Sequence, residues 1–203
     1  MTDKLIVFLR RPVKGKVKSR LAKTLGEEKA LEIYRWLLDV TFTALRNNPA
    51  EVLLYFDSNE NDEPICPDSY KSFLQKGETL GERMINAFSD QSGEAQKIVM
   101  IGSDCPEMNQ SLIQKAFDEL DNHNLVLGPA SDGGVYLIGI KGKNLDVLHE
   151  VPWESSLVFD SIISNAGADQ CAILPMMKDI DYEEDFKAFE DVFSNYKIKP
   201  KYA

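Results

Sequence analysis

The sequence predicts an α/β fold in which helices cover both faces of a mostly parallel sheet. Apolar, β-branched runs alternate along the chain with segments of helical periodicity, and this alternation is typical of parallel sheets. Four of the runs are apolar without interruption, which indicates strands buried on both faces. A basic segment containing one glycine follows the first run, at the place where α/β proteins commonly bind phosphates.

Six runs are predicted as strands: Leu5–Leu9, Val52–Phe56, Ile98–Ile101, Leu125–Leu127, Val135–Ile140 and Ala172–Leu174. A long helix from about Glu27 is indicated by an apolar stripe at intervals of three and four, made of Ala30, Ile33, Leu37, Val40 and Ala44. Four more helices are predicted near Leu80–Ser89, Gln110–Leu120, Ser156–Asn165 and Glu183–Phe193. The acidic, proline-containing stretch Ser58–Ser69 is expected to be a surface loop.

Length and composition favour a single domain over residues 1–203, with a poorly ordered tail at 197–203. No apolar stretch approaches the roughly 20 residues that cross a bilayer, and the first residues lack the features of a signal peptide. Three cysteines without metal-ligand spacing favour reduced thiols and a cytoplasmic protein. A net charge of −10 argues against nucleic-acid binding. The oligomeric state stays open.

The strongest local signal is the charge of residues 4–26, which hold eight basic side chains and no acid, although the whole chain has 23 basic and 33 acidic residues. We expect this segment to face an anionic ligand. Gly15 would let the backbone approach that ligand, while Lys16, Lys18 and Arg20 would donate to phosphate oxygens. A solvated basic loop is the alternative. The spacing does not fit a Walker P-loop.

Three aspartates follow predicted strands. Asp104, in Gly-Ser-Asp-Cys-Pro, could hold Mg²⁺ or Mn²⁺ against phosphates, or could cap a helix. Asp132 precedes two glycines, so it could bind substrate or metal, or belong to a hairpin turn. Asp181, in Asp-Ile-Asp, could be a second metal ligand. The alternative is that the acids here lie in the first turn of a helix, where the helix dipole favours negative charge.

Taken together, six segments resemble a known family. They are F-x-R-x-P-x-x-G-x-V-K-S-R-L at 8–21, L-G-E-R-M at 80–84, G-S-D-C-P at 102–106, G-P-A-x-D-G-G at 128–134, W-x-S-S at 153–156 and D-I-D at 179–181. In this order they resemble the bacterial glycosyltransferase-like family with the nucleotide-diphospho-sugar transferase (GT-A) fold. That family is similar to the guanylyltransferases for phospholactate and the molybdenum cofactor.

The resemblance implies a three-layer, Rossmann-like α/β/α sandwich that binds a nucleotide over the first strand. It implies phosphate or nucleotide contacts from Arg10, Gly15, Lys16, Lys18, Arg20, Gly81 and Arg83. It also implies that Asp104 and Asp181 ligate a divalent metal and that Asp132 faces the acceptor or the metal. The chain departs from the family pattern in having Arg10 in place of lysine, Val135 in place of tyrosine after the paired glycines, and Tyr182-Glu183-Glu184-Asp185 in place of Thr-Pro-Glu-Asp.

These observations favour a metal-dependent transferase that uses a nucleotide-activated donor, with a nucleotide-sugar or a nucleoside triphosphate as the small-molecule substrate. In glycosyl transfer, Lys18 and Arg20 would stabilise the departing diphosphate, and Asp132 would be the base or the acceptor anchor. In nucleotidyl transfer, a phosphorylated substrate would attack the α-phosphorus of a triphosphate. A nucleotide-binding protein without turnover is the remaining alternative. No motif names the acceptor.

Overall fold

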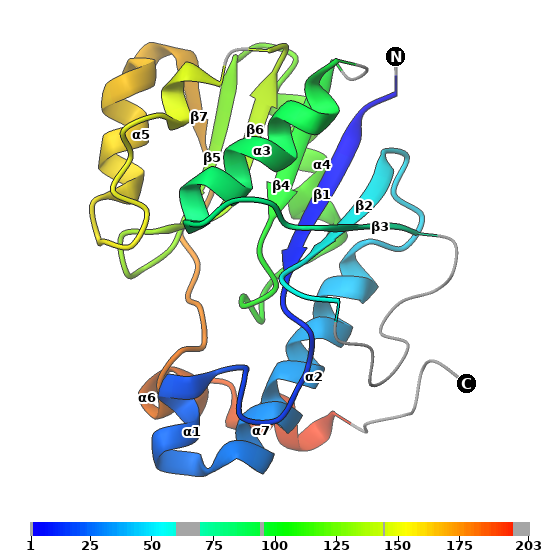
Figure 1. Cartoon of the computed structure of the whole chain (residues 1–203), viewed down its shortest axis with the longest axis vertical. Helices are drawn as coiled ribbons and strands as arrows, with labels where there is room; N and C mark the ends of the chain where they lie inside the picture. Colours follow the sequence, from blue (N-terminus) through cyan, green and yellow to red (C-terminus); the bar gives the residue numbers. More distant parts are fainter. Residues whose placement is uncertain (1, 60–69, 94–95, 144, 197–203) are drawn as a thin grey trace.

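The computed structural model describes residues 2–59, 70–93, 96–143 and 145–196. Over these residues the chain forms a seven-stranded sheet with helices on both faces (Figure 1). The predicted α/β class with a mostly parallel sheet is therefore confirmed. The predicted tail at 197–203, most of the predicted loop Ser58–Ser69 and Cys66 lie outside the described residues.

Six of the strands run in one direction, and the seventh is antiparallel. The order across the sheet is β3-β2-β1-β4-β6-β5-β7, and β6 runs against both of its neighbours. The strands are β1 (Lys4–Leu9), β2 (Glu51–Phe56), β3 (Lys71–Leu74), β4 (Lys97–Ile101), β5 (Leu125–Pro129), β6 (Val135–Lys141) and β7 (Cys171–Ile173). The carboxyl ends of all strands except β6 therefore lie at one edge of the sheet.

Each face of the sheet packs against two long helices. Figure 1 shows α3 (Leu80–Ser92) and α5 (Val158–Ala166) on the near side of the sheet, with α2 (Glu27–Ala44) and α4 (Gln110–Glu119) beyond it. Successive residues of β1 alternate between these two cores: Ile6 packs on the α3–α5 side, and its neighbours Leu5 and Val7 pack on the α2–α4 side. All three are fully buried, which explains the uninterrupted apolar run.

A third apolar cluster lies on the opposite side of α2. Leu21 of α1 (Ser19–Leu25), Phe186 of α6 (Glu183–Lys187) and Phe193 of α7 (Glu190–Asn195) pack there around Trp36. The Trp36 and Phe193 rings meet edge to face with 5.5 Å between centroids. This cluster joins the helix after the basic loop to the C-terminal helices (Figure 1).

The structure differs from the predicted helices and strands in three places. β3 was not predicted because it is an exposed edge strand and lacks the apolar run of a buried one. α1 begins inside the segment interpreted as a loop, and its seven residues are too few to show a periodicity. The single helix predicted at Glu183–Phe193 is two helices, because the backbone leaves the helical region at Phe189. Short 3₁₀ turns, Asp146–Leu148 and Ala168–Gln170, flank α5.

Candidate active site

The segments that follow β1, β4 and β7 meet at the carboxyl edge of the sheet. The backbone N–H of Ile180, after β7, donates to the carbonyl oxygen of Asp104, after β4, at 3.2 Å. The segment after β1 joins them through its side chains. Ligands of open α/β sheets bind at this edge, so the fold places these predicted motifs where a substrate would lie.

Lys18 connects the three segments directly. Its Nζ lies 2.6 Å from Oδ1 of Asp104 and 3.2 Å from Oδ1 of Asp181. Arg20 brings a second cation, with Nη1 at 3.0 Å from Oδ2 of Asp181. The four residues, predicted from three separate motifs, form one group that we call the charge cluster.

Within the charge cluster, Lys18 is the deeply placed member. Its side chain is 4% exposed, whereas the side chains of Asp104, Asp181 and Arg20 are 46%, 39% and 58% exposed. Burial acts to lower the pKa of Lys18, but the charges of Asp104 and Asp181 and their hydrogen bonds outweigh it, so the pKa is raised. Lys18 also has a left-handed backbone, with φ of 48°, a conformation that is uncommon for a residue with a side chain.

Several side chains of the basic loop, residues 10–20, form ion pairs with acids of the protein itself. Lys14 forms an ion pair with Glu28 at the start of α2, and the charge cluster pairs Lys18 and Arg20. The pairing acids are distant in sequence, so the sequence could not show these ion pairs, and the anionic ligand expected for the basic segment stays a prediction. Arg10 and Lys16 are exposed on the same loop. Gly15 has φ of 77°, which explains the glycine.

Tyr34 of α2 fixes the start of the basic loop, a role that was not predicted. Its buried hydroxyl accepts from the backbone N–H of Arg10 at 2.9 Å and donates to the carbonyl oxygen of Arg10 at 3.0 Å. It also lies 3.3 Å from Oγ of Ser103, the residue before Asp104. One hydroxyl thus holds the segment after β1 against the segment after β4.

Asp132 lies on the turn between β5 and β6, with its side chain exposed. Its Oδ1 accepts from the backbone N–H of Gly134 at 2.8 Å, so one oxygen stabilises the turn. Gly133 has φ of 88°, and a Cβ there would lie 2.0 Å from the carbonyl oxygen of Ser156. Gly133 therefore lets this turn pack against the Trp-x-Ser-Ser motif.

Gly81 and Arg83, at the start of α3, both have contacts within the protein. A Cβ on Gly81 would lie 2.1 Å from Cδ1 of Trp153, so the missing side chain makes room for the indole. Nε of Arg83 donates to the carbonyl oxygen of Gly77 at 2.9 Å. Packing and loop geometry are enough to account for both residues, and their nucleotide role stays a prediction.

Asp179 is a further acid near the charge cluster, and no role was predicted for it. Its Oδ1 is buried and has no hydrogen-bond partner among the described residues. Burial and the charge of Asp104 raise its pKa to about 7; Lys18 opposes this shift, and Asp132 and Asp181 add to it. The available signal was the Asp-Ile-Asp motif, which Asp179 shares with Asp181.

A divalent cation fits this edge only together with a ligand that supplies more oxygen atoms. Among the described residues, no three His, Cys, Asp or Glu side chains gather closely enough to hold a metal ion. Two carboxylates, Asp104 and Asp181, already share one cation, the ammonium of Lys18. Mg²⁺ typically takes one or two carboxylates plus phosphate and water oxygens. The donor set therefore fits a metal that arrives with phosphates.

Two neighbouring residues have structural roles. Cys105 is buried, and burial raises the pKa of its thiol to about 12, which excludes it as a thiolate nucleophile near neutral pH. Tyr136 follows Val135, which stands where the family has tyrosine, but its ring packs beneath Gly128 and its hydroxyl donates to the carbonyl oxygen of Pro175 at 2.8 Å. Tyr136 therefore does not supply that ring to a ligand.

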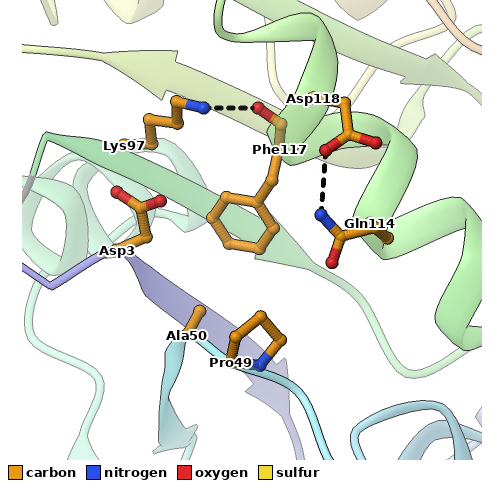
Figure 2. A pocket seen from close by; sticks show the side chains of 7 residues that line it. All are labelled: Asp3, Pro49, Ala50, Lys97, Gln114, Phe117 and Asp118. Atoms are coloured by element: carbon orange, nitrogen blue, oxygen red, sulfur yellow. Dashed lines mark hydrogen bonds between the residues drawn. The ribbon is translucent and has the colours of Figure 1, made fainter.

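A small pocket of about 150 Å³ lies at the opposite edge of the sheet, near the amino ends of β1 and β4. It is lined by Asp3, Pro49, Ala50, Lys97, Gln114, Phe117 and Asp118 (Figure 2). Lys97 donates to the carbonyl oxygen of Phe117 at 2.8 Å, and Gln114 donates to Asp118 at 2.8 Å. Two of the polar side chains that line the pocket, Lys97 and Gln114, are therefore hydrogen-bonded to other lining residues.

None of the described helices combines the length and the apolar character needed to cross a membrane.

The structure is similar to several solved structures. A candidate nucleotide-diphospho-sugar transferase from Desulfovibrio desulfuricans G20 is 27% identical, with a TM-score of 0.87 over 97% of this chain and 90% of that chain. Rv0371c from Mycobacterium tuberculosis H37Rv, in complex with manganese, is 14% identical, with a TM-score of 0.61 over 94% of this chain and 99% of that chain. A 4-diphosphocytidyl-2C-methyl-D-erythritol synthase from Anaerococcus prevotii DSM 20548 is 10% identical, with a TM-score of 0.63 over 95% of this chain and 96% of that chain.

No curated protein matches the chain in sequence. The bacterial family described as "Uncharacterized protein conserved in bacteria (DUF2064)" matches residues 40–155, which is more than half of the chain. The fold is that of the nucleotide-diphospho-sugar transferases, in agreement with the resemblance in the sequence. The chain belongs to the DUF2064 family.

Proposed function

We propose that this protein is a divalent-metal-dependent transferase that uses a nucleotide-activated donor. The observation that carries the proposal is the charge cluster, in which Lys18 and Arg20 meet Asp104 and Asp181 at the carboxyl edge of the sheet. A leaving diphosphate develops negative charge, and two cations beside a pair of carboxylates that would hold a metal suit that charge. The similarity to a candidate nucleotide-diphospho-sugar transferase supports the same class of reaction.

Each residue would have a distinct task. Arg20, whose side chain is exposed, would donate hydrogen bonds from its planar guanidinium group to phosphate oxygens. Arg10 and Lys16 would add positive charge from the same loop. Asp104 and Asp181 would hold the metal, which when bound would neutralise charge on the phosphate oxygens. Asp132 would use the oxygen that does not accept from Gly134 to bind the acceptor or to take its proton.

Glycosyl transfer from a nucleotide-sugar is the first candidate reaction. The acceptor oxygen would form a bond to the anomeric carbon of the sugar, the bond from that carbon to the diphosphate oxygen would break, and the acceptor proton would pass to Asp132. The nucleoside diphosphate would leave with its charge held by Lys18, Arg20 and the metal.

Nucleotidyl transfer is the second candidate, favoured by the similarity to a 4-diphosphocytidyl-2C-methyl-D-erythritol synthase. A phosphate oxygen of the second substrate would attack the α-phosphorus of a nucleoside triphosphate, and pyrophosphate would leave. The same cations would hold the departing charge. We also propose that residues 1–203 act as a single domain, since one sheet includes strands from Lys4 to Ile173.

A thermal-shift panel tests the proposal. Nucleoside triphosphates, UDP- and GDP-sugars and free diphosphates would each be added with and without Mn²⁺. A ligand at about 100 times its dissociation constant stabilises the folded state by roughly 2.7 kcal/mol, which moves the midpoint by a few degrees. A metal-dependent shift with a nucleotide-sugar supports glycosyl transfer, and a shift confined to one triphosphate supports nucleotidyl transfer. No shift with any nucleotide contradicts the proposal, and binding without product formation favours a protein that binds nucleotide without turnover.

A further inference from the structure

The ammonium of Lys18 occupies the position that a cation bridging Asp104 and Asp181 would take. Its two contacts are both to Oδ1 atoms, at 2.6 Å and 3.2 Å. A metal ion binds carboxylate oxygens at about 2.0–2.6 Å, so it cannot share this position with an ammonium group. The side chain of Lys18 is almost fully enclosed, and the carboxylates around it are half-exposed.

The backbone segments that carry the two carboxylates are held in place by contacts that do not involve Lys18. The backbone N–H of Ile180 donates to the carbonyl oxygen of Asp104. Asp185 accepts from the backbone N–H groups of Asp181 and Tyr182 at 3.2 Å and 2.8 Å. The backbone around both acids is therefore fixed by hydrogen bonds, and removal of the Lys18 charge leaves the two acids near each other.

Resting on the proposed function, we infer that Lys18 competes with the divalent metal for Asp104 and Asp181, so that metal and phosphate bind this site together. The metal alone must displace the ammonium of Lys18 from both carboxylates. A bound phosphate gives that ammonium another anion to pair with in place of the two carboxylates. In the proposal, Lys18 belongs to the segment from Lys16 to Arg20 that faces the donor. Each ligand thereby removes an obstacle to the other.

This competition has a thermodynamic consequence. If phosphate raises the affinity for the metal by some factor, the metal raises the affinity for phosphate by the same factor. A neutral side chain at position 18 removes the competitor, so the metal alone should bind more tightly. The same change should reduce the coupling between the two ligands.

The test is a titration of the protein with Mn²⁺ alone, with free Mn²⁺ followed by electron paramagnetic resonance. Lys18→Met and Lys18→Gln should bind Mn²⁺ about tenfold more tightly than the wild type, a factor within the usual range for coupled sites. Lys14→Met is the matched control, because it changes the net charge equally on the same loop but removes the partner of Glu28. It should stay within about twofold of the wild type, since exposed charges interact weakly. Adding Asp104→Asn to Lys18→Met should abolish the gain.

Unchanged or weaker Mn²⁺ binding in both Lys18 variants would overturn the inference. If the wild type nevertheless binds nucleotide in a Mn²⁺-dependent manner, the proposed function survives that result. If instead the variants gain Mn²⁺ affinity while the wild type binds no nucleotide, the competition is supported and the proposed function fails. The two ideas are thus separated by whether nucleotide is present in the titration.

Discussion

The hydroxyl of Tyr34 lies 3.3 Å from Oγ of Ser103 and also forms two hydrogen bonds to the backbone of Arg10. A residue in the middle of α2 thereby sets the distance between the basic loop and the Asp104 segment. The geometry of the charge cluster depends on a hydroxyl that contacts none of its members.

Tyr34→Phe should therefore lower both stability and nucleotide affinity. The ring still fills the core, but the polar groups of Arg10 and Ser103 lose a partner in a buried site, at a cost of about 1–3 kcal/mol. Urea unfolding measures the first effect, and nucleotide titration with Mn²⁺ measures the second. Tyr136→Phe, which removes one hydrogen bond to Pro175, should cost stability alone, and an equal loss of affinity in both variants would argue against positioning by Tyr34.

Arg20→Ala should weaken nucleotide binding and leave the fold intact. Charge-assisted hydrogen bonds are worth about 1.5–3 kcal/mol, which corresponds to a loss of roughly 10- to 150-fold in affinity. Stability should change by no more than about 0.5 kcal/mol, because the side chain is exposed. Calorimetric titration at low salt checks the affinity. The control is Arg46→Ala, an exposed arginine just after α2, and equal affinities for the two variants would remove Arg20 from the phosphate site.

Asp179→Asn should stabilise the metal-free protein at pH 8. The Asp179 carboxyl has a pKa of about 7 in the folded protein, above the ordinary value of about 3.9. Between these values the folded state holds a proton that the unfolded state has released, so the contribution of Asp179 to stability falls as the pH rises toward 7. Above pH 7 the buried charge is at its most unfavourable.

The asparagine variant should gain about 1–3 kcal/mol at pH 8, from the removal of a buried and unpartnered charge. The gain should shrink as the pH is lowered to 5.5, where folded Asp179 is protonated. Urea unfolding in the presence of a chelator at both pH values measures it. Asp169→Asn, at an exposed position, should show no such dependence, and a gain that is equal at both pH values would contradict the assignment.

Gly81→Ala tests whether this glycine serves packing or the nucleotide. The added methyl group would meet the indole of Trp153, and overpacking of this kind costs about 1–3 kcal/mol. Combining it with Trp153→Leu should cost less than the sum of the two single changes, because the smaller side chain leaves room for the methyl group. Thermal unfolding of the four proteins checks this, and strict additivity would indicate another role for Gly81.

The sequence was sufficient for the architecture but not for its exposed parts. β1 and β4 were predicted because burial on both faces leaves an apolar residue at almost every position. β3 has no continuous apolar run, since it is exposed and pairs only with β2. Periodicity also could not show that the helix predicted from Glu183 breaks at Phe189, because Phe186 and Phe193 pack in one cluster on either side of the break.

For the candidate site, motifs after strands were informative because parallel strands bring their carboxyl ends to one edge. That reasoning named Lys18, Arg20, Asp104 and Asp181, which the structure brings together. It could not find Tyr34, because a buried tyrosine of α2 is indistinguishable in sequence from ordinary core packing. Nor could it show that the basic loop is paired with acids such as Glu28, because ion pairing between distant segments depends on the fold.

The most direct test of the central claim is nucleotide binding by Asp104→Ala, measured by calorimetry with and without Mn²⁺. The ligand is the nucleotide that stabilises the wild type most strongly in the thermal-shift panel. We predict that the wild type binds it more tightly with Mn²⁺, and that the variant folds normally but loses this dependence on the metal. The same Mn²⁺-dependent gain in both proteins would show that Asp104 is not a ligand of the metal.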